Sequence, residues 1–451
     1  MVESARLLLL GNFSMKNTAH IIHTRWLITC EENNKILENH ALVLMDGKIH
    51  AILSSKEATA QYPNTAAEHY NHHAILPGFI NSHSHVPMNV FRGLADDLEL
   101  LDWLNHHIWP AEGKWLSHEL VYDSSLLAMG EMIRGGTTCF NDMYFFMGAI
   151  AGAAKLAGIR AHIGMNIIDV PTAWSSSPDE DFRKALEFYE QYKNDALIKP
   201  TIAPHSTYMV AAENLLRCKE IADQYKLKMN IHLQESAGEI QQSIARYQKR
   251  PLQRLYDLGL VTPDLIAIHM TQLDERDFEI LQATKPSLIH CPESNMKLAS
   301  GICPTEKLRQ QGINVALGTD GAASNNDLDM ISEMRSATFL SKISTLDPKA
   351  LPAETVLKMA TINGAKALGI EHITGSLEAG KSADFIAIDM EQLETQPLYH
   401  PLSQIVYAAS RQQVTDVWVR GMQLLKNRQL TSLDEKELLN KAHFWREKIK
   451  N

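Results

Sequence analysis

The feature that most constrains the fold of this chain is a pattern that recurs between residues 74 and about 320. Short, nearly uninterrupted apolar runs alternate eight times with longer amphipathic or alanine-rich segments. Such apolar runs are typical of parallel strands that helices cover. Eight strand–helix units predict a parallel (β/α)8 barrel. An open, doubly wound sheet is the alternative, but no glycine-rich turn follows the first strand.

The individual elements can be placed from the same pattern. We expect strands at 74–83, 136–142, 160–168, 198–205, 228–233, 265–270, 286–290 and 313–319. We expect helices at 122–134, 147–157, 212–225, 241–257, 274–283 and 304–311. Several of the intervening segments end in a glycine just before the next strand, which is a common signal for the end of a helix: Gly135, Gly158 and Gly312.

The two ends of the chain are patterned differently from the barrel. Residues 20–73 and 375–430 carry short alternating strands separated by turns. We therefore expect both ends to pair into one small β-domain. The predicted division is 15–73 and 375–451 for this domain, the latter with a terminal helix, and 74–374 for the barrel. Met15 is a candidate native start, which would make the preceding residues an extension.

The composition excludes several classes of function. The formal net charge is −10 and no run of lysine and arginine is present, so we expect no nucleic-acid partner. No apolar run reaches the ~18 residues that a membrane helix needs, so we expect no membrane partner. The five cysteines are scattered without a Cys-x-x-Cys pair, which favours reduced thiols and a cytoplasmic protein.

Five metal-ligating residues fall at the C-terminal ends of predicted barrel strands, where barrel enzymes place their active sites. His83 and His85 end the first strand, and alternate residues of a strand point the same way. His232, His269 and Asp320 end the fifth, sixth and eighth strands. Imidazoles with a carboxylate suit Zn²⁺, with Fe²⁺, Co²⁺ and Mn²⁺ as alternatives. We therefore predict one divalent metal at the barrel mouth.

Glu235 follows His232 by three residues. On a regular strand this spacing would put the two side chains on opposite faces, so we expect the chain to bend into a loop before Glu235. A carboxylic acid beside a metal-activated water can take up and return protons, and we interpret Glu235 as such a proton shuttle. A solvated loop glutamate is the alternative interpretation.

Residues 375–382 satisfy the pattern of a phosphate-binding P-loop. A true P-loop opens a helix whose N-terminus meets the phosphate. Residues 383–388 alternate like a strand instead, so we expect no ATP site there.

With this set of residues the chain resembles the amidohydrolase superfamily over essentially its whole length. Within the single-metal subtype it is most similar to the 5′-methylthioadenosine/S-adenosylhomocysteine deaminases, which are related to chlorohydrolases and guanine deaminases. The resemblance implies a β-sandwich built from both termini. It also implies a set of metal ligands and a set of catalytic residues. The ligands would be His83, His85, His232 and Asp320, and the catalytic residues Glu235, His269 and Asp320.

The resemblance also implies a nucleoside pocket. Glu112 matches a glutamate that accepts hydrogen bonds from ribose hydroxyls, and His205 matches a histidine that contacts the nucleoside. Trp103 is expected to form a pocket wall, although buried tryptophan is more often core. Some relatives hold the homocysteine carboxylate with arginines near the third strand. This chain lacks them there, and we expect the apolar Met165 to favour a methylthio group.

The resemblance implies hydrolytic deamination of the 6-amino group of 5′-methylthioadenosine, S-adenosylhomocysteine or adenosine, with a homo-oligomer, a dimer or a tetramer, as the expected assembly. Two alternatives remain. One keeps the site and changes the substrate to another aromatic heterocycle, such as guanine or a triazine, for which Glu112 would be unnecessary. The other is a barrel retained as a non-catalytic binding module, which would normally have lost some of the ligands.

Overall fold

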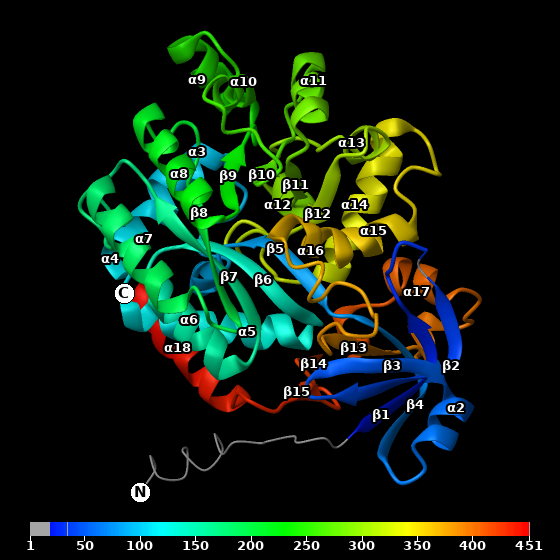
Figure 1. The fold of residues 1–451 in the computed structure, drawn as a ribbon. Coiled ribbons are helices and arrows are strands. Elements are labelled where there is room, and N and C mark those ends of the chain that lie inside the picture. The colour runs from blue at the N-terminus through cyan, green and yellow to red at the C-terminus, as the bar shows by residue number, and fades with distance from the viewer. Residues whose placement is uncertain (1–18, 34, 451) are drawn as a thin grey trace, which may run out of the picture.

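The computed structural model describes residues 19–33 and 35–450. Two eight-stranded sheets organise these residues, one inside a ring of helices and one assembled from both ends of the chain (Figure 1). The predicted (β/α)8 barrel and the separate β-domain are thereby confirmed. The candidate start at Met15 and the residues before it lie outside the described residues. The predicted division at 73/74 and 374/375 stays a prediction.

The barrel strands follow one another around the sheet in chain order, and neighbouring strands are parallel. The two ends of the sheet meet through the backbone N–H of Asp320, which donates to the carbonyl of His83 at 3.0 Å. The eight barrel strands are β5 Phe79–Ser84, β6 Thr137–Tyr144, β7 Arg160–Ile167, β8 Ile198–Pro204, β9 Met229–Leu233, β10 Leu265–His269, β11 Ser287–His290 and β12 Asn314–Leu317.

The predicted first strand, 74–83, is wrong as a single element. Its beginning belongs to β4, Ala66–Pro77, in the terminal sheet, and only β5 enters the barrel. Gly78 separates the two strands. A Cβ at this glycine would lie 2.1 Å from the Thr138 side chain, so the chain can pass here only without a side chain.

Two further differences from the expected elements have local causes. The expected helix 241–257 is divided into α9, Ala237–Tyr247, and α10, Pro251–Asp257, because Pro251 lacks the N–H that a continuous helix would use. Helix α7, Pro178–Tyr192, is not among the expected helices although its start is marked. Ser177 accepts a hydrogen bond from the backbone N–H of Glu180, and a proline occupies the first helical position.

The remaining helices surround the barrel or close its mouth. Those around the barrel are α5 His118–Arg134, α6 Met147–Ala157, α7 Pro178–Tyr192, α8 Ala212–Tyr225, α9 Ala237–Tyr247, α10 Pro251–Asp257, α11 Glu275–Thr284, α12 Pro292–Lys297, α13 Thr305–Gln310, α14 Met330–Thr345, α15 Ala353–Met359 and α16 Ile362–Leu368. Those between β5 and α5 are η1 Val86–Phe91, α3 Leu100–Trp103, the π-helical turn η2 Leu104–Ile108 and α4 Trp109–Trp115. This second group forms the long segment after the first barrel strand.

The terminal sheet has the order β16-β15-β14-β13-β4-β1-β2-β3. β4 from the N-terminal part pairs antiparallel with β13 from the C-terminal part, which joins the two ends of the chain. Besides β4, its strands are β1 His20–Ile28, β2 Ile36–Met45, β3 Lys48–Ser54, β13 Phe385–Asp389, β14 Val414–Val419, β15 Met422–Lys426 and β16 Gln429–Leu430. The helices between these strands are α2 Ser55–Gln61, η3 Leu393–Thr395, α17 Pro401–Tyr407 and η4 Arg411–Gln413. The chain ends in α18, Glu435–Lys450, which lies along α5.

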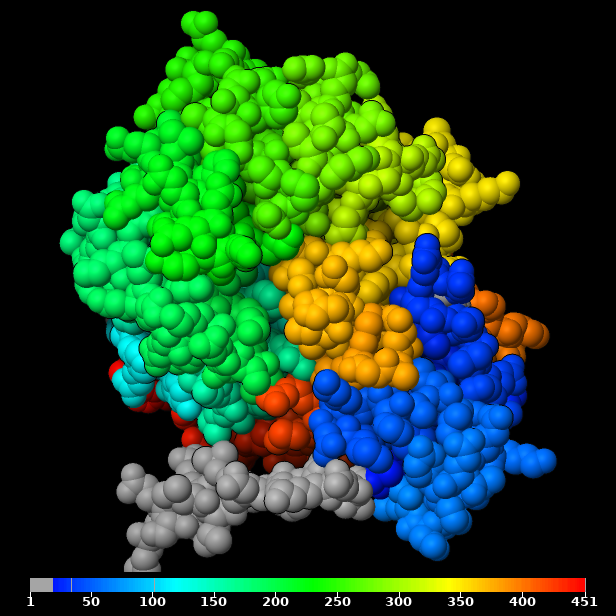
Figure 2. All heavy atoms as spheres, in the orientation of Figure 1, coloured from blue at the N-terminus to red at the C-terminus, as the bar shows by residue number. Residues whose placement is uncertain are grey.

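The terminal sheet packs directly against the side of the barrel (Figure 2). A buried ion pair crosses this contact, with the Arg160 Nε donating to Asp384 Oδ2 at 2.5 Å. The same arginine also donates to the Ser382 hydroxyl at 2.8 Å. Because an unpaired buried charge is costly, this pair fixes how the sheet meets the barrel.

The P-loop-like segment 375–382 leads into strand β13 and not into a helix, as the alternating residues predicted. The Lys381 ammonium donates to the Ser376 hydroxyl at 2.5 Å and pairs with Glu378 at 2.8 Å. The lysine is therefore neutralised within its own loop.

Within the described residues, no helix has both the length and the apolar character that crossing a bilayer requires. All five cysteines are buried, and none of them is in a disulfide.

Candidate active site

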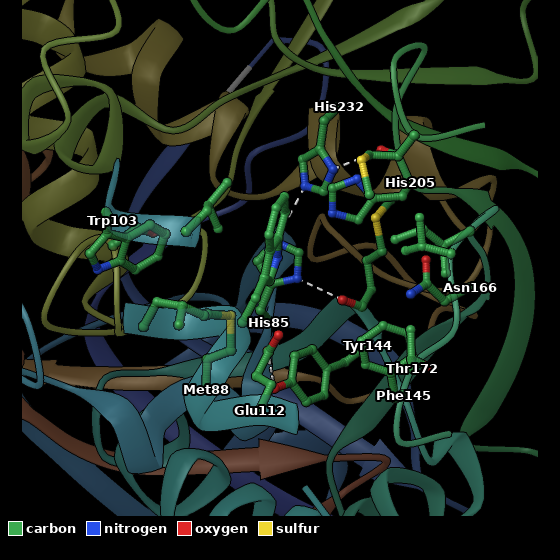
Figure 3. Close-up of a pocket in the computed structure, with 18 of the residues that line it drawn as sticks. His85, Met88, Trp103, Glu112, Tyr144, Phe145, Asn166, Thr172, His205 and His232 are labelled. Atoms are coloured by element: carbon green, nitrogen blue, oxygen red, sulfur yellow. Dashed lines mark hydrogen bonds between the residues drawn. The ribbon is translucent and has the colours of Figure 1, made fainter. Parts of the chain in front are cut away.

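A cavity of about 420 Å³ opens at the C-terminal ends of the barrel strands. One wall consists of strand-end residues, including His85, His232, His269 and Asp320. A second wall comes from the long segment after β5 and includes Trp103 and Glu112. Figure 3 shows side chains of both walls pointing into the same space.

The four predicted metal ligands converge at this mouth. The Asp320 Oδ1 atom lies 3.3 Å from the Nε2 atom of His83 and 3.3 Å from the Nε2 atom of His85. The Nε2 atoms of His85 and His232 are 3.2 Å apart. Ligand atoms of His83, His85 and His232 form one group within 4.8 Å, and those of His83, His269 and Asp320 form a second. The structure thus brings together all five residues that the sequence indicated.

The tautomers of these histidines identify what the cluster can hold. His85 Nδ1 lies 2.6 Å from the Met143 carbonyl, and His232 Nδ1 lies 2.8 Å from the His205 carbonyl. A carbonyl only accepts, so each Nδ1 carries the hydrogen and each Nε2 presents a lone pair. Two such lone pairs face one another across 3.2 Å, which is repulsive unless a cation lies between them.

Burial reinforces this interpretation. Neither ring nitrogen of the fully buried His83 has a hydrogen-bond partner among the described residues. Burial lowers the pKa of His83 to about 4 and, together with the neighbouring histidines, holds the pKa of His232 well below its usual value. Neutral imidazoles are the form that binds a metal. The donor set therefore fits a divalent cation.

Asp320 is held as an anionic partner of the histidines. Burial acts to raise its pKa, but the close contacts with His83 and with the neighbouring imidazoles of His85 and His269 hold the pKa of Asp320 well below its usual value. Its Oδ2 atom accepts hydrogen bonds from the hydroxyls of Ser294 at 2.6 Å and Ser324 at 3.0 Å. The two serines leave Oδ1 directed at His83 and His85.

The backbone is strained where the site is built. Gln234, His269 and Asp320 have positive φ angles of 52°, 75° and 63° at the ends of β9, β10 and β12. Left-handed backbone in a residue other than glycine costs about 1–3 kcal/mol and concentrates at functional sites. The turn at Gln234 is the bend that the sequence required, because it brings Glu235 into the cavity.

Glu235 lies next to His269 inside the cavity, and burial raises the pKa of the Glu235 carboxyl while His269 opposes the shift. Its Oε2 atom is 3.9 Å from His269 Nε2. The other ring nitrogen of His269 lies 3.0 Å from the Asn295 side-chain oxygen, so Nε2 again points toward the cluster. A raised carboxyl pKa suits a group that gives and takes protons near neutral pH.

Beneath the histidines lies a layer of buried amides that the sequence reasoning missed. Asn81 and Asn230 stand two residues before His83 and His232, on the same inward face. Asn81 donates to the Thr319 hydroxyl at 2.7 Å and accepts from the Thr319 N–H at 3.0 Å. We call Asn81, Asn141 and Asn230 the amide layer.

The other two members of the amide layer bond to each other. The Asn141 amide nitrogen donates to Asn230 Oδ1 at 3.3 Å, and the Asn230 nitrogen donates to the Thr201 hydroxyl at 2.8 Å. The amide layer therefore connects β5, β6, β8, β9 and the segment just after β12, below the metal cluster.

The substrate side carries most of the other predicted residues. Glu112 and His205 both line the cavity. Glu112 accepts a hydrogen bond from the Tyr144 hydroxyl, and burial, opposed by that bond, raises the pKa of Glu112 to about 7. Burial lowers the pKa of His205 to about 3. Trp103 is almost fully buried yet lines the cavity, so it serves as both core and wall.

Met165 is the one predicted substrate-binding residue that the structure does not bring into the cavity. It is fully buried in the main hydrophobic core. Side chains alternate along β7, so its neighbour Asn166 lines the cavity instead.

Other cavity residues escaped the sequence reasoning. Tyr144 ends β6, and its position at a barrel strand end was a usable signal. Ser324 lies in the segment after β12, and Ser294, which is not part of the lining, lies on α12; neither has a spacing that marks it. Their role follows only from their contact with Asp320.

The barrel with a histidine–aspartate cluster at its mouth defines a class of metal-dependent barrel hydrolases. The chain belongs to the amidohydrolase family, whose model matches residues 74–424.

Known proteins similar to the chain agree with this assignment. It is 44% identical over 438 residues to a protein from Teredinibacter turnerae named 5-methylthioadenosine/S-adenosylhomocysteine deaminase, covering 96% of this chain and 99% of that protein. It is 40% identical to a 5′-deoxyadenosine deaminase from Methanosarcina barkeri, covering 94% and 96%. The solved structure of an adenosine deaminase from Xanthomonas campestris with bound zinc superimposes with a TM-score of 0.93 at 45% identity, covering 96% and 99%.

Proposed function

We propose that this protein is an adenine-nucleoside deaminase, which hydrolyses the 6-amino group to give an inosine derivative and ammonia. The observation that carries the proposal is one cavity with the metal-suited cluster and Glu235 on one wall and Glu112 on the other. Similarity over nearly the full length to proteins named as deaminases of this kind supports it.

We propose that His83, His85, His232 and Asp320 hold one divalent cation, Zn²⁺ by preference, with Fe²⁺, Co²⁺ or Mn²⁺ as alternatives. Such a cation, when bound, would lower the pKa of water to about 7 and make hydroxide available at neutral pH. The zinc in the Xanthomonas structure supports this choice of metal.

The protein's own residues then move the protons. Asp320 and His269 orient the attacking water, and one water proton passes to Asp320 as the oxygen bonds to C6. Glu235 protonates the neighbouring ring nitrogen, which makes C6 more electrophilic. The amino group takes the proton from Asp320 and leaves as ammonia. The remaining hydroxyl proton returns to Glu235, which restores the carboxylic acid.

Among adenine nucleosides we propose a preference for those with an uncharged 5′ substituent, such as 5′-methylthioadenosine or adenosine. The described lining of the cavity contains no lysine or arginine, and it includes the apolar side chains of Ile168, Val170 and Met209. A buried carboxylate without a cationic partner is costly. The homocysteine carboxylate of S-adenosylhomocysteine would find no partner of that kind here.

An ammonia-release assay over adenosine, 5′-methylthioadenosine, S-adenosylhomocysteine, guanine and a chlorotriazine tests both proposals. We expect turnover of the adenine nucleosides, with a higher kcat/KM for 5′-methylthioadenosine than for S-adenosylhomocysteine. Turnover of guanine or the triazine alone would refute the nucleoside assignment. An equal or higher kcat/KM for S-adenosylhomocysteine would refute the preference for an uncharged substituent.

We also propose a cytoplasmic homo-oligomer, a dimer or a tetramer. The five buried cysteines, none of them in a disulfide, support a reducing compartment. Phe339 and Ile343 on α14 and Leu346 directly after it are 52%, 66% and 84% exposed, which supports a surface that a second subunit covers there. Light scattering of the purified protein measures the assembly, and a monomer at micromolar concentration would contradict it.

A further inference from the structure

Tyr144 and Glu112 form a pair in the lining of the cavity. The Tyr144 hydroxyl donates a hydrogen bond to Glu112 Oε1, and both residues line the cavity. Figure 3 shows the two side chains pointing toward one another, close to His85. They come from distant parts of the chain, because Glu112 lies on α4 and Tyr144 ends β6.

The surroundings of the pair make this hydrogen bond important. Within the part of the chain that the structure describes, no cation is paired with the Glu112 carboxylate, and the Tyr144 hydroxyl is its side-chain partner. A glutamate side chain has several rotatable bonds, whereas the nearly buried Tyr144 ring is fixed by packing. The tyrosine therefore sets the direction of the carboxylate.

The same strand end also orients the metal cluster. The carbonyl of Met143, next to Tyr144, lies 2.6 Å from His85 Nδ1. One residue earlier, the Asp142 carboxyl accepts from the backbone N–H of Val86 at 2.6 Å. The end of β6 thus contacts both His85, at the reacting end of the cavity, and Glu112. A single rigid strand sets the separation between the two walls.

We propose that Tyr144 is a positioning residue for ribose recognition and that Tyr144 and Glu112 together select nucleosides that carry both ribose hydroxyls. This inference rests on the proposed function and deepens it. With Oε1 engaged by Tyr144, the Oε2 atom is left to accept from a sugar hydroxyl, and the tyrosine oxygen keeps lone pairs for the second. The hydrogen bond from Tyr144 also opposes the effect of burial on the Glu112 pKa, which favours the acceptor form of the carboxyl.

The test compares adenosine with 2′-deoxyadenosine in the metal-loaded protein and in the Tyr144→Phe variant, which loses only the hydroxyl. We expect the unaltered protein to favour adenosine by about tenfold or more in kcat/KM, because a site built to bond a hydroxyl rejects its absence. In Tyr144→Phe, we expect kcat/KM for adenosine to fall about 10- to 100-fold, mostly through KM. The kcat/KM for 2′-deoxyadenosine should fall by a factor several times smaller. The ratio of kcat/KM for adenosine to that for 2′-deoxyadenosine should therefore be lower in Tyr144→Phe than in the unaltered protein.

Two further variants make the outcome specific. Tyr407→Phe removes a tyrosine hydroxyl on α17, outside the cavity lining, and should leave both substrates unaffected. In the double variant Tyr144→Phe/Glu112→Gln, kcat/KM for adenosine should fall by less than the product of the falls in Tyr144→Phe and Glu112→Gln, because the effects of residues in contact are not additive. Metal content and circular dichroism establish that each variant is folded and loaded.

Two results would overturn the inference without touching the proposed function. One is an equal loss for both substrates in Tyr144→Phe, and the other is a loss confined to kcat. If the unaltered protein deaminates neither adenosine, 2′-deoxyadenosine nor 5′-methylthioadenosine, the proposed function itself fails.

Discussion

The two walls of the cavity are built in opposite ways. The metal wall consists of strand ends whose side chains are fixed by several contacts each, as the two serines on Asp320 and the carbonyls behind His85 and His232 show. The ribose wall consists of short helices between β5 and α5, where Glu112 depends on one hydrogen bond from Tyr144. Under the proposed function, the rigid barrel strands position the groups that react. The segment between β5 and α5, whose Glu112 has fewer contacts, selects the substrate.

The largest effect should come from removing the metal. Dialysis against a chelator should reduce kcat by orders of magnitude, since the hydroxide supply depends on the cation. Zn²⁺ should restore activity, and parallel addition of Fe²⁺, Co²⁺ or Mn²⁺ identifies the preferred metal. Binding of an inosine product, which also contacts the ribose wall, should weaken far less. Full activity in protein shown to be metal-free would contradict the proposed division between the walls.

Replacing Glu235 by Gln should lower kcat by about 10²- to 10⁴-fold, because the variant can no longer transfer a proton to the ring nitrogen. Metal content, measured by elemental analysis, should stay near normal because Glu235 is not one of the proposed ligands. The exposed Glu213 on α8 provides the control, since Glu213→Gln makes the same chemical change far from the cavity. An unchanged kcat in Glu235→Gln would contradict the proposal that Glu235 transfers the proton.

Replacing Glu112 by Ala should raise KM for adenosine, so that kcat/KM falls about 10- to 100-fold while kcat changes little. The loss should disappear with free adenine, which has no ribose, if adenine is turned over at all. Steady-state kinetics with both compounds measures the effect. An unaltered kcat/KM for adenosine would favour a different heterocycle as the substrate.

Replacing Asn230 by Ala should weaken the metal wall without touching a ligand. The change leaves the buried Asn141 amide and Thr201 hydroxyl with fewer partners, so the free energy of unfolding should fall by about 1–3 kcal/mol. Metal affinity should fall about 10- to 100-fold because the layer supports the ligand strands. Asn64→Ala, at an exposed position, is the control. If Asn230→Ala is destabilised but binds the metal with unchanged affinity, the amide layer contributes to stability and not to metal binding.

The smallest effect concerns pH. The pKa of Glu112 is about 7 in the folded protein, above its usual value of 4.5, so between these values the folded state binds more protons than the unfolded state. Stability therefore falls as pH rises through this window. Glu112→Gln should flatten that part of the pH profile and raise Tm at pH 8 by about 1–2 °C. If Tm of Glu112→Gln changes with pH in the same way as Tm of the unaltered protein, the pKa of Glu112 is not raised.

The metal wall was predictable because each ligand closes a strand of the recurring pattern. His83, His232 and Asp320 could be found from residue type and position alone, and the structure brings them together. The bend before Glu235 was predictable for the same reason, since a strand has a fixed alternation. Barrel topology then guarantees that all strand ends meet.

The ribose wall was harder to predict. Glu112 was identified only by resemblance, because nothing in its local sequence distinguishes it from a surface glutamate. Tyr144 was missed, and Met165 was expected in the cavity although the alternation along β7 directs Asn166 there instead. Contacts between distant segments, such as Tyr144 with Glu112, follow from packing and leave no periodic signal in the sequence.

The passage of the chain through Gly78 has a consequence for variants far from the cavity. The residues on either side belong to β4 and β5, and the Gly78 N–H bonds the Asp384 carbonyl in the terminal sheet at 3.2 Å. Only five positions further on stands His83. A substitution that tilts the terminal sheet would therefore displace the innermost imidazole, and damage at the periphery of this protein should be detected first as loss of bound metal.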